Sequence, residues 1–318
     1  MPGRKHLTRL VQAIEGSVEH LNNSLPGIER RILNEVELLL RDLDLVNGNV
    51  RASVKNLRTI SRIKTKLERI VVRDSGYRRG VDTYLGAFDK INAIQQDYFR
   101  TVEQGFEPST FLKALENQSL EDTALSLTRG GIASNVVDPI RGVLQAGVRD
   151  QLSYSQLITS LRETITGSPD KLGGLERYVK QLTTDGLNQY AAQYMEVVSS
   201  DLGLDWYQYT GVKIETSRDF CIAMVNKRFF HRLEIPDLLK GQFPQFRAIG
   251  GSLNPKTGLP DGMNPATTSE NFLVYRGGYN CHHQPIPVTE TIVPSSERKR
   301  VYDKFGVPYN AEVFEIAA

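Results

Sequence analysis

The chain has 318 residues, of which 40% are hydrophobic and 24% are charged, with two cysteines and a formal net charge of +2 at pH 7. This length allows two domains, and the composition is that of a globular protein. Two cysteines exclude a disulfide framework, and no apolar run approaches the ~20 residues of a membrane span, so we expect synthesis in a reducing cytoplasm and no membrane partner.

Helical periodicity dominates the chain up to about residue 203. Apolar residues recur every three or four positions, as on the buried face of an amphipathic helix. The segments expected to be helical are 4–22, 28–43, 50–72, 81–102, a helix that starts near 107–109, 132–148 and 170–202. Turn signals separate them at Pro26–Gly27, Asn47–Gly48–Asn49, Gly130–Gly131 and Gly167–Ser168–Pro169, and Asp138–Pro139 predicts a kink or restart. Consecutive helices of this kind usually fold as an antiparallel bundle.

The third of these segments carries the strongest charge signal. Its cations advance by three or four residues and form a basic ridge about 33 Å long. The ridge consists of Arg51, Lys55, Arg58, Arg62, Lys66, Arg69 and Arg73. Beside it runs an apolar stripe of Val50, Val54, Leu57, Ile60, Ile63, Leu67 and Ile70. Two interpretations stay open: a surface for double-stranded DNA or an acidic protein, since phosphate binding is driven by counterion release, and an ordinary solvated helix face.

From Gly203 onward the pattern becomes mixed. Residues 206–210 alternate aromatic and polar side chains, as a half-buried strand does. Further extended segments are expected at 212–215, 272–275 and 284–292, and helices from Arg218 onward, at 232–240 with a break at Pro236, and at 295–305. Ser217 is expected to cap the helix that starts at Arg218. Residues 243–265 are rich in Gly and Pro and are expected to form a long loop.

The predicted fold class is therefore mainly α with a small α+β C-terminal module. The expected division is a helical bundle domain at 1–203, the α+β module at 204–292, and a C-terminal helix and tail at 293–318. The helical domain is the expected source of oligomeric and polyanion contacts.

The cysteines and histidines of the C-terminal module form the candidate metal site. In an extended segment, Cys281 and His283 point to the same side of the backbone. Together with Cys221, and with Asp219 or His231 as the fourth ligand, they would make a tetrahedral zinc site. Three alternatives stay open: two packed free thiols, a disulfide between the cysteines, and a catalytic dyad in which Cys221 is the nucleophile and His283 the base.

Short ordered motifs give this module a resemblance to a known family. They are Ser217-Arg218-x-Phe220-Cys221, the run Phe272 to Tyr275, and Arg276-Gly277-Gly278-Tyr279-Asn280-Cys281-x-His283. Over residues 206–288 the sequence resembles the minor head proteins of tailed bacteriophages, the head-morphogenesis family typified by the F protein of phage Mu. Many members of that family have a second Cys or an Arg where this chain has His282–His283.

The resemblance implies a structural minor capsid protein rather than an enzyme. Such a protein is made in the host bacterial cytoplasm and is located in the virion, at the portal vertex or the capsid interior. Its implied partners are the portal protein or the major capsid protein, in several copies per particle, and the basic ridge would face packaged DNA. The alternative from another class is a Cys/His or metal-dependent hydrolase or nuclease carried in the virion. A DNA-binding regulator is a third, but the sequence has no recognisable helix-turn-helix.

Overall fold

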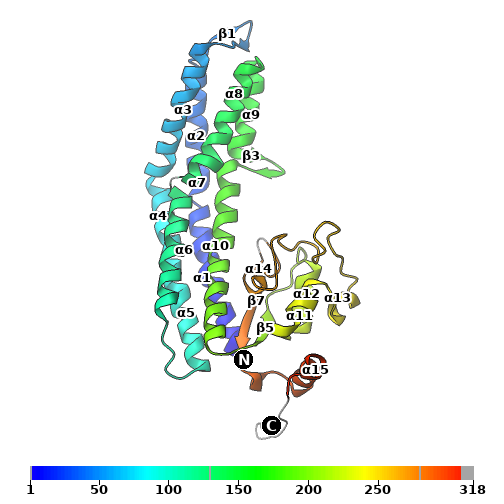
Figure 1. Ribbon diagram of the computed structural model, residues 1–318. Helices are drawn as coiled ribbons and strands as arrows, with labels where there is room; N and C mark the ends of the chain where they lie inside the picture. The colour runs from blue at the N-terminus through cyan, green and yellow to red at the C-terminus, as the bar shows by residue number, and fades with distance from the viewer. Residues whose placement is uncertain (1, 129, 279–280, 309–318) are drawn as a thin grey trace. The chain divides into compact units, whose positions relative to one another are not determined.

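The computed structural model describes residues 2–128, 130–278 and 281–308. It is predominantly helical with one small three-stranded antiparallel sheet near the C-terminus, which confirms the predicted fold class (Figure 1). The chain divides into two compact units. Unit 1 comprises residues 1–14, 89–115 and 185–318, and unit 2 comprises 15–88 and 116–184. This division differs from the expected boundary at residue 203, because the long helices α1 (Pro2–Asn22), α6 (Thr110–Thr128) and α10 (Gly174–Asp201) each contribute residues to both units.

Unit 2 contains a ring of packed helices. The helix α2 (Leu25–Leu40) contacts α3 (Val54–Arg73) and α9 (Tyr154–Thr166), and α8 (Asp138–Arg149) contacts the same two helices (Figure 1). Each helix buries apolar residues at helical spacing; in α3 these are Ile60, Ile63, Leu67 and Val71. A serine is the N-cap of α3 and of α9. Its hydroxyl oxygen accepts a hydrogen bond from a backbone N–H group of the first turn that otherwise has no partner.

A β-hairpin joins α2 to α3, and it corrects the predicted start of the third helix. Strands β1 (Leu45–Val46) and β2 (Asn49–Val50) pair around Asn47 and Gly48, whose φ angles are 51° and 80°. Asn and Gly tolerate this left-handed conformation, so the predicted turn is confirmed. The helix itself begins only at Val54. The buried Asn56 side chain holds the hairpin, since its oxygen accepts from the backbone N–H of Asp44 and its amide donates to the carbonyls of Asp44 and Arg51.

Elsewhere in unit 2, the predicted restart at Asp138–Pro139 is confirmed. After α4 (Ser75–Leu85), α6 and the short α7 (Gly130–Ile132), residues Ala133–Val137 form a π-helical turn, and α8 follows with proline in its first turn. The backbone N–H of Asp138 donates to the carbonyl of Ala133, five residues earlier. A second hairpin, β3 (Gly167–Ser168) with β4 (Lys171–Leu172), precedes α10.

The sheet of unit 1 has the strand order β6-β5-β7 and is antiparallel throughout. The central β5 (Trp206–Thr210) pairs with β6 (Phe229–His231) and β7 (Gln284–Val288), so the strands expected at 206–210 and at the start of 284–292 are confirmed. The strand expected at 212–215 is wrong. Val212 and Ile214 are 79% and 62% exposed and have no buried face to join.

The segment 272–275 is also not a strand but a single helical turn, α14 (Phe272–Tyr275). Periodicity alone does not separate a short apolar run in a strand from one in a buried helix. The other helices of this region are α11 (Asp219–Lys227), a 3-10 turn at Arg232–Glu234, α12 (Ile235–Leu239) with Pro236 in its first turn, and α13 (Pro244–Ala248) inside the expected loop. Ser217 does not cap α11, because its hydroxyl accepts from the N–H of Ile214 in the preceding turn.

Two apolar clusters cover the two faces of this sheet. On one side, Tyr207, Tyr209 and Phe230 pack with residues of α11 to α14. On the other, Trp206, Phe229 and Val288 pack against α15 (Ser295–Phe305), which confirms the expected C-terminal helix. The 3-10 turn Glu290–Ile292 leads from β7 toward α15. Alternation of side chains along β5 therefore decides which residues join which cluster.

The remaining part of unit 1 is helical and is bonded to β7. The side chain of Tyr98, in α5 (Ala87–Val102), stacks on His6 and donates a hydrogen bond to the carbonyl of Pro287. The amide of Gln284 donates to the side chain of Asn188 in α10 at 3.0 Å. In the described parts of the chain, no helix combines the length and the apolar character that crossing a membrane requires.

Candidate functional site: a Cys/His cluster and a basic helix face

Three of the five predicted metal-ligand residues come together in unit 1. The Sγ atoms of Cys221 and Cys281, 60 residues apart in sequence, lie 3.7 Å from each other. The Sγ of Cys281 lies 3.8 Å from Nδ1 of His283. All three side chains are buried, and their ligand atoms lie within 4.8 Å of one another. The two cysteines are free thiols at this separation, because a disulfide requires about 2.05 Å.

The other two predicted ligands lie elsewhere. Asp219 is exposed at the first residue of α11. His231 lies on the opposite side of the sheet, where its ring centroid is 5.1 Å from that of Trp206 and 5.9 Å from that of Tyr302. Its Nδ1 accepts a hydrogen bond from the N–H of Leu233. The strand alternation that places Trp206 in the second apolar cluster also takes the neighbouring His231 away from the cysteines.

Glycines allow the backbone to approach the cluster. A Cβ atom on Gly277 would lie 2.4 Å from Sγ of Cys221 and 2.6 Å from Sγ of Cys281. A Cβ atom on Gly211 would lie 2.3 Å from the imidazole of His283. Either contact is shorter than real Cβ atoms tolerate, so any larger residue would displace the cluster. Nothing in the local sequence around Gly277 shows which side chains approach it.

The two thiols share a hydrogen bond and titrate as a pair. The hydrogen bond from Cys221 holds the pKa of Cys281 well below its usual value, and His283 and the positive charge of Arg276 act in the same direction. The hydrogen bond to Cys281, together with burial, raises the pKa of Cys221. The arrangement therefore favours a thiolate at Cys281 next to a protonated thiol at Cys221, and thiolate is the form that binds metals and attacks electrophiles.

Tyr209 completes the apolar side of the cluster. Its ring stacks on His283 with the centroids 5.8 Å apart, and its hydroxyl donates to Sγ of Cys221 at 3.6 Å. Burial raises the pKa of Tyr209 well above its usual value, so the phenol keeps its proton. The Nε2 atom of His283 is buried and has no hydrogen-bond partner among the described protein atoms.

Arg276 supplies a buried positive charge. It is 2% exposed and has a φ of 34°, a left-handed conformation that costs free energy for a residue with a side chain. Its guanidinium donates to the carbonyls of His283 and Val274, which ties the main chain at these two positions together. A cleft of about 10 Å³, about the room of one water molecule, lies beside Cys281 and is lined also by Asp185, Asn188 and Asn264.

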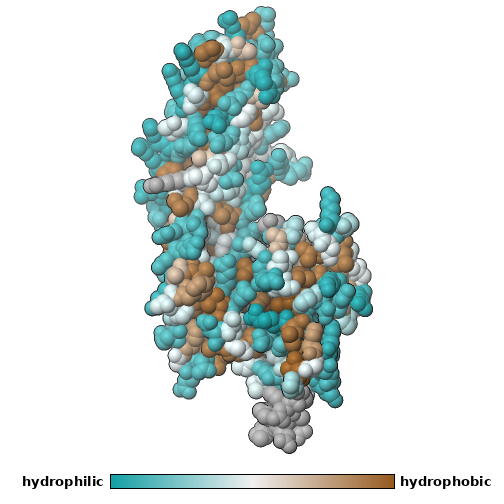
Figure 2. Space-filling view, in the orientation of Figure 1, coloured by the Kyte–Doolittle hydropathy of each residue, from teal (hydrophilic) through white to brown (hydrophobic). Residues whose placement is uncertain are grey.

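The predicted basic ridge lies on the exposed side of α3. The ridge residues from Lys55 to Arg73 are all exposed, opposite the buried Ile60, Ile63 and Leu67. The predicted apolar stripe is wrong at Val54 and Leu57, which are 65% and 50% exposed, while Asn56 between them is buried. Hydrophilic side chains line the outer edge of the region that α3 occupies (Figure 2).

Ion pairs divide the ridge into neutralised and available cations. Lys55 pairs with Asp44 at 2.6 Å, and Lys66 pairs with Glu35 of α2. Within the described residues, the other ridge members form no ion pair: Arg51, Arg58, Arg62, Arg69 and Arg73. The sequence does not distinguish these two sets, because the acidic partners come from other elements.

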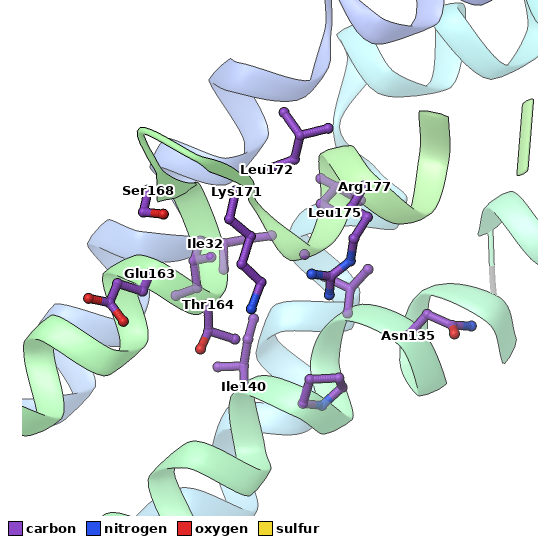
Figure 3. A pocket seen from close by; sticks show the side chains of 14 residues that line it. Ile32, Asn135, Ile140, Glu163, Thr164, Ser168, Lys171, Leu172, Leu175 and Arg177 are labelled. Atoms are coloured by element: carbon purple, nitrogen blue, oxygen red, sulfur yellow. The ribbon is translucent and has the colours of Figure 1, made fainter. Parts of the chain in front are cut away.

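A pocket in unit 2 was not foreseen from the sequence. It has a volume of about 170 Å³ and is walled by the π-helical turn, α8, α9 and the start of α10. Lys171 and Arg177 extend their charged ends into it above the apolar Ile32 and Ile140 (Figure 3). Glu163 also lines the pocket, so the pocket combines charges of both signs with an apolar floor.

Comparisons with known proteins identify no relative: no family model matches the chain, and no curated protein or solved structure is significantly similar to it. The functional interpretation therefore depends on the residues and their geometry.

Proposed function

We propose that this protein is a structural minor component of a tailed-phage head, bound to the portal or to the inner capsid during assembly. One observation carries the proposal. The motifs Ser217–Cys221 and Arg276–His283, on which the resemblance to minor head proteins rests, converge on one buried cluster in unit 1. In a folded structural module, the residues of a motif come together to close the core. Packing therefore sets the spacing of these residues in the sequence.

The proposed contribution of unit 2 is contact with packaged double-stranded DNA. The arginines of the ridge that form no ion pair are spread along α3, and from Arg58 to Arg73 the helix rises about 22 Å. Cations held on a rigid helix neutralise successive phosphates without reading base sequence. A head protein that meets DNA of any sequence needs this kind of binding. An acidic region of the portal is the other partner with the right charge, and the DNA experiment described in the Discussion distinguishes the two.

The alternative function is a Cys/His hydrolase or nuclease, and one observation favours it. The sequence predicted Cys221 as the nucleophile, but Cys281 is the cysteine whose Sγ pairs closely with His283 and whose thiolate is favoured. Access argues against it, because Cys281 is 6% exposed and borders a cleft of about 10 Å³, which is room for water but not for a peptide or a phosphodiester. Cleavage of a nucleic-acid or ester substrate that disappears in Cys281→Ser, while the variant stays folded, would establish the enzyme.

Detection of the protein in purified proheads and virions tests the proposed function. We expect it to co-sediment with proheads, to cross-link to the portal or the major capsid protein, and to be present in several copies per particle. A protein that stays in the free fraction, with particles assembled in its absence fully infective, overturns the proposal.

A further inference from the structure

We propose that Cys221, Cys281 and His283 bind one zinc ion that ties helix α11 to the segment preceding strand β7. The thiolate sulfurs and Nδ1 of the imidazole are the ligands, and a water molecule takes the fourth position. This inference concerns the folding of unit 1 and does not depend on a role in a phage head.

Two of the three distances between the donor atoms match the edges of a zinc tetrahedron. With Zn–S bonds of about 2.3 Å and Zn–N bonds of about 2.05 Å, tetrahedral angles place two sulfurs about 3.8 Å apart and a sulfur about 3.6 Å from a nitrogen. The observed Sγ–Sγ distance is 3.7 Å and the observed Sγ–Nδ1 distance is 3.8 Å. The third pair, Sγ of Cys221 and the imidazole of His283, lies within 4.8 Å, so one ion contacts all three donors once the imidazole moves toward Cys221.

The surroundings suit a metal better than a pair of packed thiols. The missing Cβ of Gly277 lets both sulfurs lie against the backbone on one side, which leaves their other side for an ion. The unpartnered Nε2 of His283 is free to carry the proton when Nδ1 binds the ion. Two thiolates balance the charge of Zn²⁺, which removes most of the cost of burying the ion.

The hydrogen bonds around the cluster hold the ligands in position. Arg276 donates to the carbonyl of His283, and the hydroxyl of Tyr209 donates to Sγ of Cys221. Groups that bond to metal ligands in this way fix their orientation and tune their basicity. Asp185 lines the same small cleft as Arg276 and Cys281, so a carboxylate is available to offset the guanidinium charge.

The fourth position is assigned to water because the described residues supply only three ligands, and the cleft beside Cys281 gives a water molecule access to that ligand. The cleft's volume of about 10 Å³ admits one water molecule. The polar side chains of Asn188, Asn264 and Asp185 lie around it as hydrogen-bond partners. In the parts of the chain that the structure describes, no fourth Cys, His, Asp or Glu joins the three ligands.

Metal analysis of the intact wild-type chain is the direct test. The protein is purified without chelator, saturated with zinc, desalted and analysed for metal together with its concentration. We expect one zinc per chain, released in step with modification of both thiols by a mercurial reagent. Retention of less than about a tenth of an equivalent overturns the proposal and leaves a hydrogen-bonded thiol pair.

Cobalt substitution identifies the ligands. Tetrahedral Co²⁺ bound by thiolates has intense charge-transfer and visible absorption, which we expect for wild type and for the control His282→Asn, whose exposed side chain neighbours His283 in sequence. We expect Cys221→Ser and Cys281→Ser to weaken Co²⁺ binding at least 100-fold. His283→Cys supplies another metal ligand and is expected to retain one zinc per chain. Unchanged cobalt spectra in both serine variants contradict the assignment, and the wild-type zinc content decides the matter if either variant fails to fold.

Discussion

At the scale of single residues, Gly277 decides whether the cluster can exist. The sulfurs of Cys221 and Cys281 both lie too close to the position that a Cβ atom on Gly277 would take. Nothing in the sequence near Gly277 indicates this, because Cys221 is contributed by a helix far earlier in the chain. The constraint is steric and independent of any metal.

Gly277→Ala is therefore expected to destabilise the protein. Overpacking a closed core usually costs about 1–3 kcal/mol, and here the sulfurs must move to admit the methyl group. Urea denaturation measures the change in unfolding free energy. Gly142→Ala is the matched control, since its Cβ would meet open space on helix α8 and alanine favours the helix. Equal stability of Gly277→Ala and wild type would show that the cluster is not closely packed.

Glu29 gives a second prediction at this scale. Its carboxylate is 5% exposed and accepts a hydrogen bond from the backbone N–H of Glu176 at 3.1 Å. Burial raises its pKa to about 7; the charge of Glu176 adds to the rise, while the hydrogen bond and Lys180 oppose it. The folded state holds this proton more tightly than the unfolded state. The protonated Glu29 therefore contributes its full stabilisation of the folded state below about pH 4.5, and this stabilisation is lost as the pH rises through about 7.

We expect Glu29→Gln to remove this pH dependence. The shift corresponds to about 3 kcal/mol, and partial screening by solvent reduces this to roughly 1–2 kcal/mol. The variant, which keeps the accepting oxygen, should be more stable than wild type at pH 8 and similar to it at pH 4.5. Unfolding free energies across this range provide the measurement, with the exposed Glu121→Gln as control. Parallel pH profiles for wild type and Glu29→Gln would contradict the expectation.

At the scale of elements, α3 combines two faces with different roles. Its buried face packs in the helix ring of unit 2, and its opposite face presents arginines that form no ion pair with described residues. Lys55 and Lys66 belong to the ridge in sequence but are neutralised by Asp44 and Glu35. The surface available to a polyanion is therefore narrower than the sequence pattern indicates.

Replacing the available arginines should weaken DNA binding without unfolding the helix. The variant changes Arg58, Arg62, Arg69 and Arg73 to Gln, which keeps helix propensity nearly constant. We expect unchanged helical circular dichroism, weaker binding to duplex DNA of any sequence, and a slope of log affinity against log salt that is smaller by up to about four.

The matched control for this experiment removes the same number of exposed cations from unit 1. Its substitutions to Gln are at Lys240, Arg247, Lys256 and Lys299. We expect the control to keep most of the affinity and the salt slope of wild type. Equal losses in both variants indicate binding to positive charge in general. An unaffected α3 variant leaves an acidic protein as the partner, which a pulldown of the portal with the same variant tests.

At the scale of the whole molecule, the two compact units separate the cluster from the basic ridge. All three cluster residues belong to unit 1, and α3 belongs to unit 2. Hydrogen exchange can therefore report on each of them independently.

Cys281→Ala is expected to loosen unit 1 selectively. It removes the contacts of a buried sulfur with Cys221 and His283, a loss of about 1–3 kcal/mol. Amide exchange should become faster in α11 and β7 and stay unchanged in α3 and α9. Equal acceleration in all four elements would mean that the units do not unfold separately.

Features that depend on local periodicity and turn chemistry could be predicted from the sequence. Most helices of the first two hundred residues, the strand at 206–210, the turn at Asn47–Gly48 and the restart at Asp138 follow from spacing or from a backbone preference. Each of these is set by residues within a few positions of one another, so one sequence is enough to predict them. The helix α9 was not predicted, and the single helix predicted at 81–102 is divided between α4 and α5. The pairing of Cys221 with the Cys281–His283 segment was expected only as a hypothesis.

Tertiary structure alone decided the features that depend on distant partners. Residues 212–215 are not a strand, because β5 already pairs with β6 and β7 on its two edges. Phe272–Tyr275 is a helical turn with Phe272, Leu273 and Val274 buried. His231 is excluded from the cluster by the face on which its strand places it. Lys55 and Lys66 are not available to a polyanion, because each forms an ion pair with an acidic residue of another element. In each case the deciding contact joins residues that local sequence cannot relate, since packing and charge neutralisation act across space rather than along the chain.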